Sequence, residues 1–307
     1  MQRSVARWRS AVFVWLIGAA ALTASLTGCG TGGAEHPGAT TVVASTDVWG
    51  SVASAVAGGH VAVKSILTSA NADPHSYAAS PSDAAAITDA ALVVYNGGGY
   101  DPWVDRVLAA HPAINSIDAY SLLGTTTDKH PPDEHVFYDL AVAKIVAVTI
   151  ADRLASIDPG HAAEYRTNAA AFGRAADAIA NSERAIATTY PAAAVVATEP
   201  VVYYLLTASG LINRTPVAFT VASENDDDPA PADMAAVLDL IEGRRVAALL
   251  INPQTSTPTT NDLQAAARRA GVPVTEVTET LPGGTDYLTW QRNTVNQLTA
   301  ALQSGRR

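Results

Sequence analysis

Short apolar runs alternate with amphipathic stretches through the first part of the chain. Four of these runs have the length and composition of buried strands: 41–46, 62–68, 91–97 and 113–118. Three stretches between them carry the helical spacing of apolar residues: 48–58, 81–90 and 101–110. Because strands that alternate with helices form parallel sheets covered by helices on both faces, this part of the chain predicts one α/β lobe.

The middle of the chain has a purely helical pattern. One predicted helix ends at 158–160 and places its apolar residues on a single face: Leu140, Ala143, Ala147, Ile150, Ala151 and Leu154. A second helix is predicted over 161–188, with apolar residues recurring every seven positions: Tyr165, Phe172, Ile179 and Ile186. About 27 helical residues make a rod roughly 40 Å long, which exceeds the width of one lobe. We therefore interpret it as a backbone helix that joins two lobes, rather than as an isolated coiled coil.

The alternation of strands and helices resumes after this long helix. The predicted strands are 193–199, 216–222, 246–252 and 272–279, and the predicted helices lie near 201–209, 231–242, 260–270 and 285–303. The sequence thus predicts an α/β fold of two Rossmann-like lobes with parallel sheets, joined by one long rigid backbone helix. Its predicted parts are an N-terminal lobe at 41–157, a linking helix at 158–190 and a C-terminal lobe at 191–307.

The first forty residues have the pattern of an export signal. Three arginines precede the apolar core: Arg3, Arg7 and Arg9. That core, 11–26, is too short for a good membrane span and leads through small residues to Cys29. We interpret 1–28 as a signal peptide, Cys29 as the lipidated first residue after cleavage, and 29–40 as a flexible tether. The alternative is an ordinary secretory signal with a buried free thiol. Both interpretations predict an extracytoplasmic protein, and lipidation of Cys29 would anchor it to the cell membrane.

Cysteine content and charge narrow the possible partners. Cys29 is the only cysteine among 307 residues, which excludes a disulfide framework and a cysteine-based metal site. The chain has 19 Lys+Arg and 29 Asp+Glu, and loss of the three signal arginines leaves 19 − 3 = 16, for a mature net charge of 16 − 29 = −13. Such a charge argues against nucleic acid and anionic membrane surfaces as partners and is compatible with cations. We expect a monomer.

Four metal-capable side chains stand at the boundaries of predicted strands or helices: His75, His135, Glu199 and Glu279. The two histidines belong to the first lobe and the two glutamates to the second. Ligand sites of α/β sheets form at the carboxyl ends of strands, where loops from several strands converge. Two imidazoles and two carboxylates suit a borderline or hard divalent ion.

The segments around these residues resemble those of the metal-binding lipoproteins of bacterial ABC importers for zinc and manganese. DPHSY at 73–77 matches that family's D-P-H-x-Y/F, and DEHVFYD at 133–139 matches N-P-H-x-W-x-D more loosely. TEPVVYYL at 198–205 and ETL at 279–281 resemble its third and fourth ligand segments. The resemblance implies that His75, His135, Glu199 and Glu279 hold Zn²⁺ or Mn²⁺, and that the protein delivers the ion to the membrane permease of an ABC importer.

The chain departs from the family pattern at several positions. Asp133 and Glu134 stand where the family has Asn-Pro, and Phe137 stands where it has Trp. Glu279 replaces the commoner Asp, and Glu276 is the alternative fourth ligand. A strand's end lets a side chain reach the crevice between the lobes, which favours Glu279.

The remaining histidines and acidic residues give no second site. The histidine-rich loop of many zinc importers is missing, because 124–135 holds only His130 before the predicted ligand; zinc versus manganese therefore stays open. We interpret the other histidines as structural or solvated: His36, His60, His111, His130 and His161. The acidic stretch 223–233 lacks the ligand spacing of a calcium loop and predicts a solvated loop before a helix.

Two other functions would fit the same residues. An exported zinc hydrolase would use Glu199 or Glu279 as a general base and leave a coordination position for water. An adhesin would use the metal only for folding, and its deletion would leave metal uptake unchanged. Four protein ligands leave no necessary open position for activated water, so the sequence favours carriage of the metal over catalysis.

Overall fold

The computed structural model describes residues 41–68, 74–124, 133–225 and 227–305. The predicted signal peptide, the tether with Cys29 and His36, and His130 lie outside the described residues. Within the described part of the chain, no helix is both long and apolar enough to cross a membrane.

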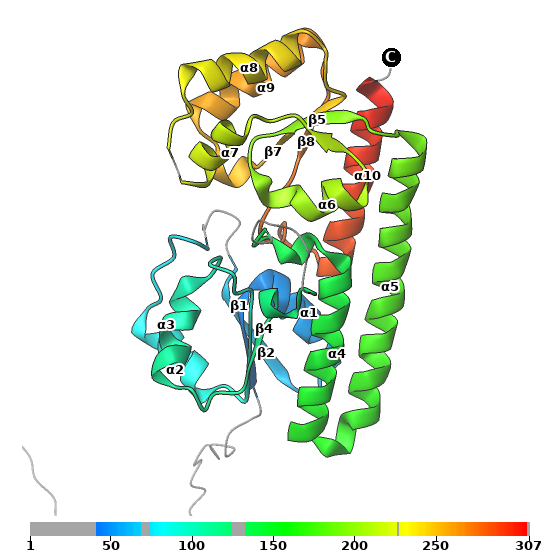
Figure 1. Ribbon diagram of the computed structural model, residues 1–307. Helices are drawn as coiled ribbons and strands as arrows, with labels where there is room; N and C mark the ends of the chain where they lie inside the picture. Colours follow the sequence, from blue (N-terminus) through cyan, green and yellow to red (C-terminus); the bar gives the residue numbers. More distant parts are fainter. Residues whose placement is uncertain (1–40, 69–73, 125–132, 226, 306–307) are drawn as a thin grey trace, which may run out of the picture. The chain divides into compact units, whose positions relative to one another are not determined.

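The first lobe is built on a parallel sheet of four strands (Figure 1). The strands are β1 (Thr41–Thr46), β2 (Ala62–Leu67), β3 (Leu92–Tyr95) and β4 (Ser116–Asp118), in the order β2-β1-β3-β4. The helices between them are α1 (Asp47–Ala57), α2 (Pro81–Asp89) and α3 (Pro102–Ala110). Alternate residues of β1 face opposite sides: Val42 and Ala44 belong to the core with α1 and α4 (Leu140–Ile157), whereas Val43 packs with Ile87 and Trp103 of α2 and α3.

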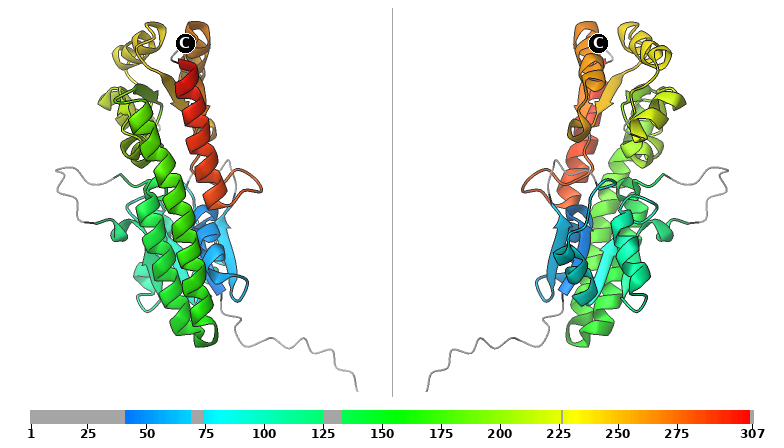
Figure 2. Two further views of the ribbon diagram at one scale, coloured as in Figure 1. Left: turned by 90° about the vertical axis from the view of Figure 1, so that its right-hand side faces the viewer. Right: turned by 90° about the vertical axis from the view of Figure 1, so that its left-hand side faces the viewer.

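Two long helices follow the first sheet and form an antiparallel pair. They are α4 and α5 (Ala162–Thr189), the latter spanning 28 residues, or about 42 Å. The predicted seven-residue repeat of α5 is buried, as are the predicted apolar residues of α4. α5 packs on α1 of the first lobe and on α6 (Tyr203–Ala208) and α10 (Tyr287–Gly305) of the second, as Figures 1 and 2 show. The prediction of a helix that links two lobes is confirmed.

The second lobe repeats the topology of the first. Its parallel strands are β5 (Ala194–Ala197), β6 (Ile212–Asn213), β7 (Ala248–Ile251) and β8 (Val274–Glu276), in the order β6-β5-β7-β8. Besides α6 and α10 it contains α7 (Val217–Glu224), α8 (Pro231–Glu242) and α9 (Pro258–Ala270). Short 3₁₀ helices complete the described chain: η1 (Tyr120–Leu122), η2 (Val136–Tyr138), η3 (Pro159–His161), η4 (Pro200–Val202) and η5 (Pro253–Thr255). The predicted fold class of two α/β lobes is confirmed.

One strand prediction is wrong. The apolar run 216–222 was expected as a strand, but it forms α7, and the strand beside β5 is the two-residue β6. Short apolar runs fit a strand and a helix equally well by periodicity. In α7 only Phe219 is buried, while Val217 is 79% and Val221 is 48% exposed, so the run has a single inward residue rather than a buried strand's continuous apolar surface.

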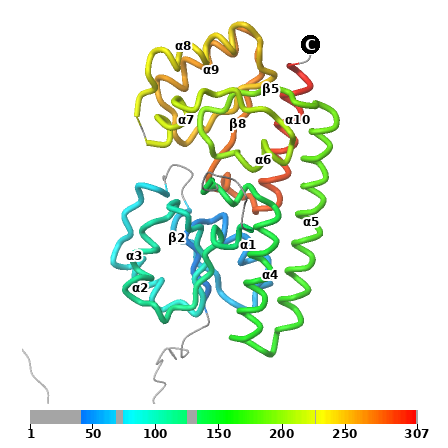
Figure 3. Tube along the Cα trace, viewed as in Figure 1, coloured from blue at the N-terminus to red at the C-terminus, as the bar shows by residue number. Residues whose placement is uncertain are grey.

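The topology brings specific loops of the two lobes to one region. In each sheet the two central strands are the first and the third in chain order. The connections that follow these two strands lead to opposite edges of the sheet, which makes a crevice at their carboxyl ends. After β8 the chain returns to the first lobe before α10 begins (Figure 3). There the backbone N–H of Leu281 donates to Oδ1 of Asp47 at 3.2 Å, and that of Tyr287 donates to Oγ of Ser51 at 2.9 Å.

Candidate metal centre

One cavity contains all four predicted ligands. His75, His135, Glu199 and Glu279 line it, and its volume is about 60 Å³. The alternative ligand Glu276 does not line it, because this residue is exposed at the end of β8. The other described histidines lie outside the cavity as well: His60, His111 and His161.

His135 is the most deeply buried of the four, at 3% exposure. It directly precedes η2, and its Nδ1 lies 2.8 Å from Oδ1 of Asp133. The same carboxylate oxygen accepts the backbone N–H of His135 at 2.9 Å. A carboxylate that holds one ring nitrogen as a donor leaves the other nitrogen with the lone pair that a metal needs. Burial lowers the pKa of His135, but the hydrogen bond and charge of Asp133, with the charges of Glu279 and Glu134, outweigh it and raise the pKa above the usual value.

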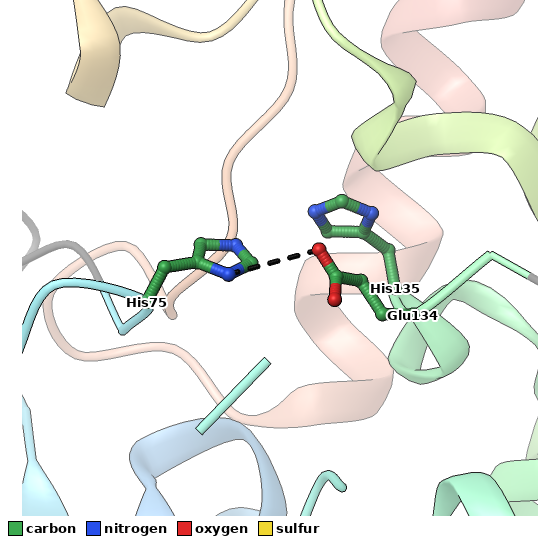
Figure 4. A group of neighbouring side chains, drawn as sticks. All are labelled: His75, Glu134 and His135. Atoms are coloured by element: carbon green, nitrogen blue, oxygen red, sulfur yellow. Dashed lines mark ion pairs between the residues drawn. The ribbon is translucent and has the colours of Figure 1, made fainter. Parts of the chain in front are cut away.

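His75 stands in the loop between β2 and α2 and is partly exposed. Its Nδ1 lies 3.6 Å from Oε1 of Glu134, the ion pair drawn in Figure 4, and its Nε2 lies 3.9 Å from Oε2 of Glu279. Its ring meets that of Tyr100 edge-on at 4.8 Å between centroids and that of His135 at 6.0 Å. His75 is thus placed between a carboxylate of its own lobe and a carboxylate of the second lobe.

Glu134 is a site residue that the sequence analysis did not select. Its carboxylate, His75 and His135 each offer one ligand atom, and these atoms all lie within 4.8 Å of one another. Burial raises the pKa of Glu134, and the charge of Asp133 adds to this while that of His135 opposes it. The sequence feature that could have identified Glu134 is its position directly before the predicted ligand His135, where the family pattern has Pro.

The two carboxylates of the second lobe are held by one asparagine. Nδ2 of Asn252 donates to Oε2 of Glu199 and to Oε1 of Glu279, at 2.9 Å each. The hydroxyl of Thr255 donates to the other oxygen of Glu199, and the backbone N–H of Glu279 donates to Oε1 of Gln254 at 2.6 Å. Asn252 was not among the predicted site residues, although it follows β7 as Glu199 follows β5.

The charge and chemistry of the lining favour a cation. Among the described residues that line the cavity, carboxylates and imidazoles are the ionisable groups, and neither Lys nor Arg is present. Oxygen and imidazole nitrogen ligands without thiolate suit zinc, manganese and related divalent ions. The arrangement is therefore chemically fit to hold one divalent ion between the lobes.

Comparison with known proteins agrees with this chemistry. The ZnuA family, described as "Zinc-uptake complex component A periplasmic", matches residues 42–301. The metal ABC transporter substrate-binding lipoprotein SloC of Streptococcus mutans is 23% identical over 248 residues, which cover 76% of this chain and 78% of SloC. The manganese-binding lipoprotein MntA of Halalkalibacterium halodurans is 31% identical over 155 residues, covering 47% and 50% of the two chains.

The fold is similar to solved structures too. The laminin-binding protein Lmb of Streptococcus agalactiae, described as bifunctional with adhesin and metal-transporting activity, superposes with a TM-score of 0.72 at 24% identity. The match covers 86% of this chain and 99% of Lmb.

Proposed function

Because the chain belongs to the ZnuA family of periplasmic zinc-uptake components, we propose that His75, His135, Glu199 and Glu279 hold the divalent metal that it carries. Proteins of this family are the substrate-binding components of ABC metal importers and not enzymes, and this chain is one of them. The hydrolase alternative finds no support among the relatives.

The observation that carries the ligand assignment is the convergence of imidazoles and carboxylates from different lobes on one cavity. Nε2 of His75 and Oε2 of Glu279, 204 positions apart, lie only 3.9 Å from each other. A divalent ion between them would replace this contact by two coordinate bonds of about 2 Å each. The ion therefore favours the arrangement of the lobes in which both sets of ligands meet, and that arrangement is what the permease recognises.

The transported ion is Zn²⁺ or Mn²⁺. The family description names zinc, and the relative MntA is named as manganese-binding. Imidazole ligands suit zinc, carboxylates admit manganese, and the general order of affinities favours zinc at equal availability.

Several further properties belong to the same proposal. Cys29 carries the lipid anchor, 29–40 is the tether, and the mature protein works as an extracytoplasmic monomer on the cell membrane. Its lobes are 41–157 and 191–307, joined by 158–190. Its acidic charge argues against nucleic acid as a partner. The names of its lipoprotein relatives support the anchor.

Metal titration of the purified protein tests the assignment. Calorimetry with Zn²⁺ and Mn²⁺ is expected to give one site per chain, and His75→Ala and Glu279→Gln are each expected to weaken it strongly. Glu276→Gln, outside the cavity, is the matched control. A parent protein that binds neither ion would contradict the proposed function, while full binding by both ligand variants would contradict the ligand set. An adhesin would show unchanged metal uptake when the protein is deleted from its host.

A further inference from the structure

The first lobe alone places three ligand-type side chains together. His75, Glu134 and His135 each offer a ligand atom, and these atoms lie within 4.8 Å of one another; in Figure 4 the carboxylate of Glu134 faces His75 and lies beside the ring of His135. We propose that Glu134 is a direct metal ligand, which joins His75 and His135 as a third ligand from the first lobe. This inference rests on the proposed function and adds to the site a ligand at a position where the family pattern has Pro.

The surroundings of Glu134 fix its backbone and leave room for its side chain. Its carbonyl oxygen accepts a hydrogen bond from Nδ2 of Asn96 at 2.8 Å, and Oδ1 of Asn96 accepts from Nε1 of Trp49 at 3.2 Å. Asn96 follows β3, so the carboxyl end of a central strand positions Glu134. Oε2 of Glu134 lies beside Gly99, where a Cβ would come within 3.3 Å of it. The glycine keeps open the space that the carboxylate uses.

The carboxylates of the two lobes differ in what holds them. Both oxygens of Glu199 already accept hydrogen bonds within the second lobe, from Asn252 and Thr255. The Glu134 carboxylate forms an ion pair with His75, itself a predicted ligand. An ion bound by both side chains would take the place of this ion pair.

A third carboxylate also changes which ion the site prefers. Zinc sites are usually four-coordinate, and two imidazoles with two carboxylates already complete that number. Manganese takes more ligands and favours carboxylate oxygen. Glu134 therefore adds more to the binding of Mn²⁺ than to the binding of Zn²⁺.

Calorimetric titration of Glu134→Gln with Mn²⁺ and with Zn²⁺ tests the proposal. The neutral amide keeps the shape of the side chain, and the affinity for Mn²⁺ is expected to fall about 10- to 100-fold, more than the affinity for Zn²⁺. Glu276→Gln is the matched control, because Glu276 is exposed outside the cavity and its variant is expected to stay within about twofold of the parent. Glu134→Asp, which draws the carboxylate back by one methylene, should fall between the parent and Glu134→Gln.

The outcomes separate this proposal from the proposed function. If Glu134→Gln binds both ions as the parent does, while His75→Ala loses binding, Glu134 is not a ligand and the function stands. An equal loss of affinity for Mn²⁺ and Zn²⁺ in Glu134→Gln would contradict the claim that Glu134 favours manganese. If the parent binds neither ion, the proposed function itself fails. Thermal unfolding of the metal-free variants checks that each is folded.

Discussion

The side-chain amide of Asn252 donates a hydrogen bond to Oε1 of Glu279 at 2.9 Å, and the same nitrogen donates to Glu199. Asn252 can reach both carboxylates because β7, which it follows, lies between β5 and β8 in the sheet. Two glutamates side by side repel each other, and a shared donor offsets part of that repulsion while it fixes their orientation. Asn252 thus organises the half of the site that the second lobe supplies.

Replacement of Asn252 by Ala is expected to weaken Zn²⁺ and Mn²⁺ binding about 10- to 100-fold, the range for groups that orient metal ligands. Calorimetric titration measures the change. Asn261→Ala is the control, since Asn261 is exposed in the same lobe and does not line the cavity. Parent-like affinity in Asn252→Ala would show that the two glutamates need no shared donor.

Metal binding is expected to stabilise the folded protein, by an amount that grows with the logarithm of the ratio of free metal to the dissociation constant. At free metal about 100 times the dissociation constant, the parent should gain about 2.7 kcal/mol. For a protein of this size that raises the melting temperature by about 5–10 °C. His135→Ala is expected to abolish most of this shift, whereas His111→Ala, an exposed histidine outside the cavity, should keep it. An undiminished shift in His135→Ala would remove that residue from the ligand set.

Much of the fold followed from periodicity because most elements have one clearly apolar face. The heptad of α5, for example, predicted both its length and its buried side. The exception was the region of β6, where the strand itself has only two exposed residues and the neighbouring apolar run forms α7. A two-residue strand carries too little pattern to detect, and its place in the sheet depends on pairing with β5.

Residues that line the cavity were predicted only where the side-chain type and the motif agreed. The two histidines and Glu279 all line the cavity, and so does Glu199. Asn252 and Glu134 were missed for different reasons: Asn252 is uncharged and acts through hydrogen bonds, and Glu134 acts from a position where the resemblance offers no ligand. Both depend on three-dimensional neighbours that a single sequence does not reveal.

Glu183 is expected to make the free energy of unfolding dependent on pH. It is 3% exposed, and its Oε1 has no hydrogen-bond partner among the described residues. Burial, with the charge of Asp139, raises its pKa from 4.5 to about 7. Between these two values the folded state holds a proton that the unfolded state has lost, so the free energy of unfolding falls as pH rises, by up to about 3 kcal/mol above pH 7.

Glu183→Gln removes the loss of stability at high pH, because a neutral amide has no charge to bury. The variant is expected to be more stable than the parent at pH 8 by about 1–3 kcal/mol, and the difference should vanish below about pH 4.5. Urea unfolding of the metal-free proteins across this range gives the measurement. Glu242→Gln, an exposed carboxylate on α8, should show no such trend. A constant difference at every pH would mean that Glu183 does not titrate in this range.

Tyr138 connects the two ligand segments directly. It lies three residues after His135, and its buried hydroxyl donates to the carbonyl oxygen of Thr278, next to Glu279, at 2.8 Å. Tyr138→Phe leaves that carbonyl without this donor, so the free energy of unfolding should fall by about 1–3 kcal/mol. Because the bond joins segments that carry proposed ligands of the two lobes, metal affinity is expected to fall with it. Denaturant unfolding and calorimetry test both effects, with Tyr203→Phe, 47% exposed, as the control. A loss of stability with unchanged affinity would show that this bond supports the fold without setting the metal site.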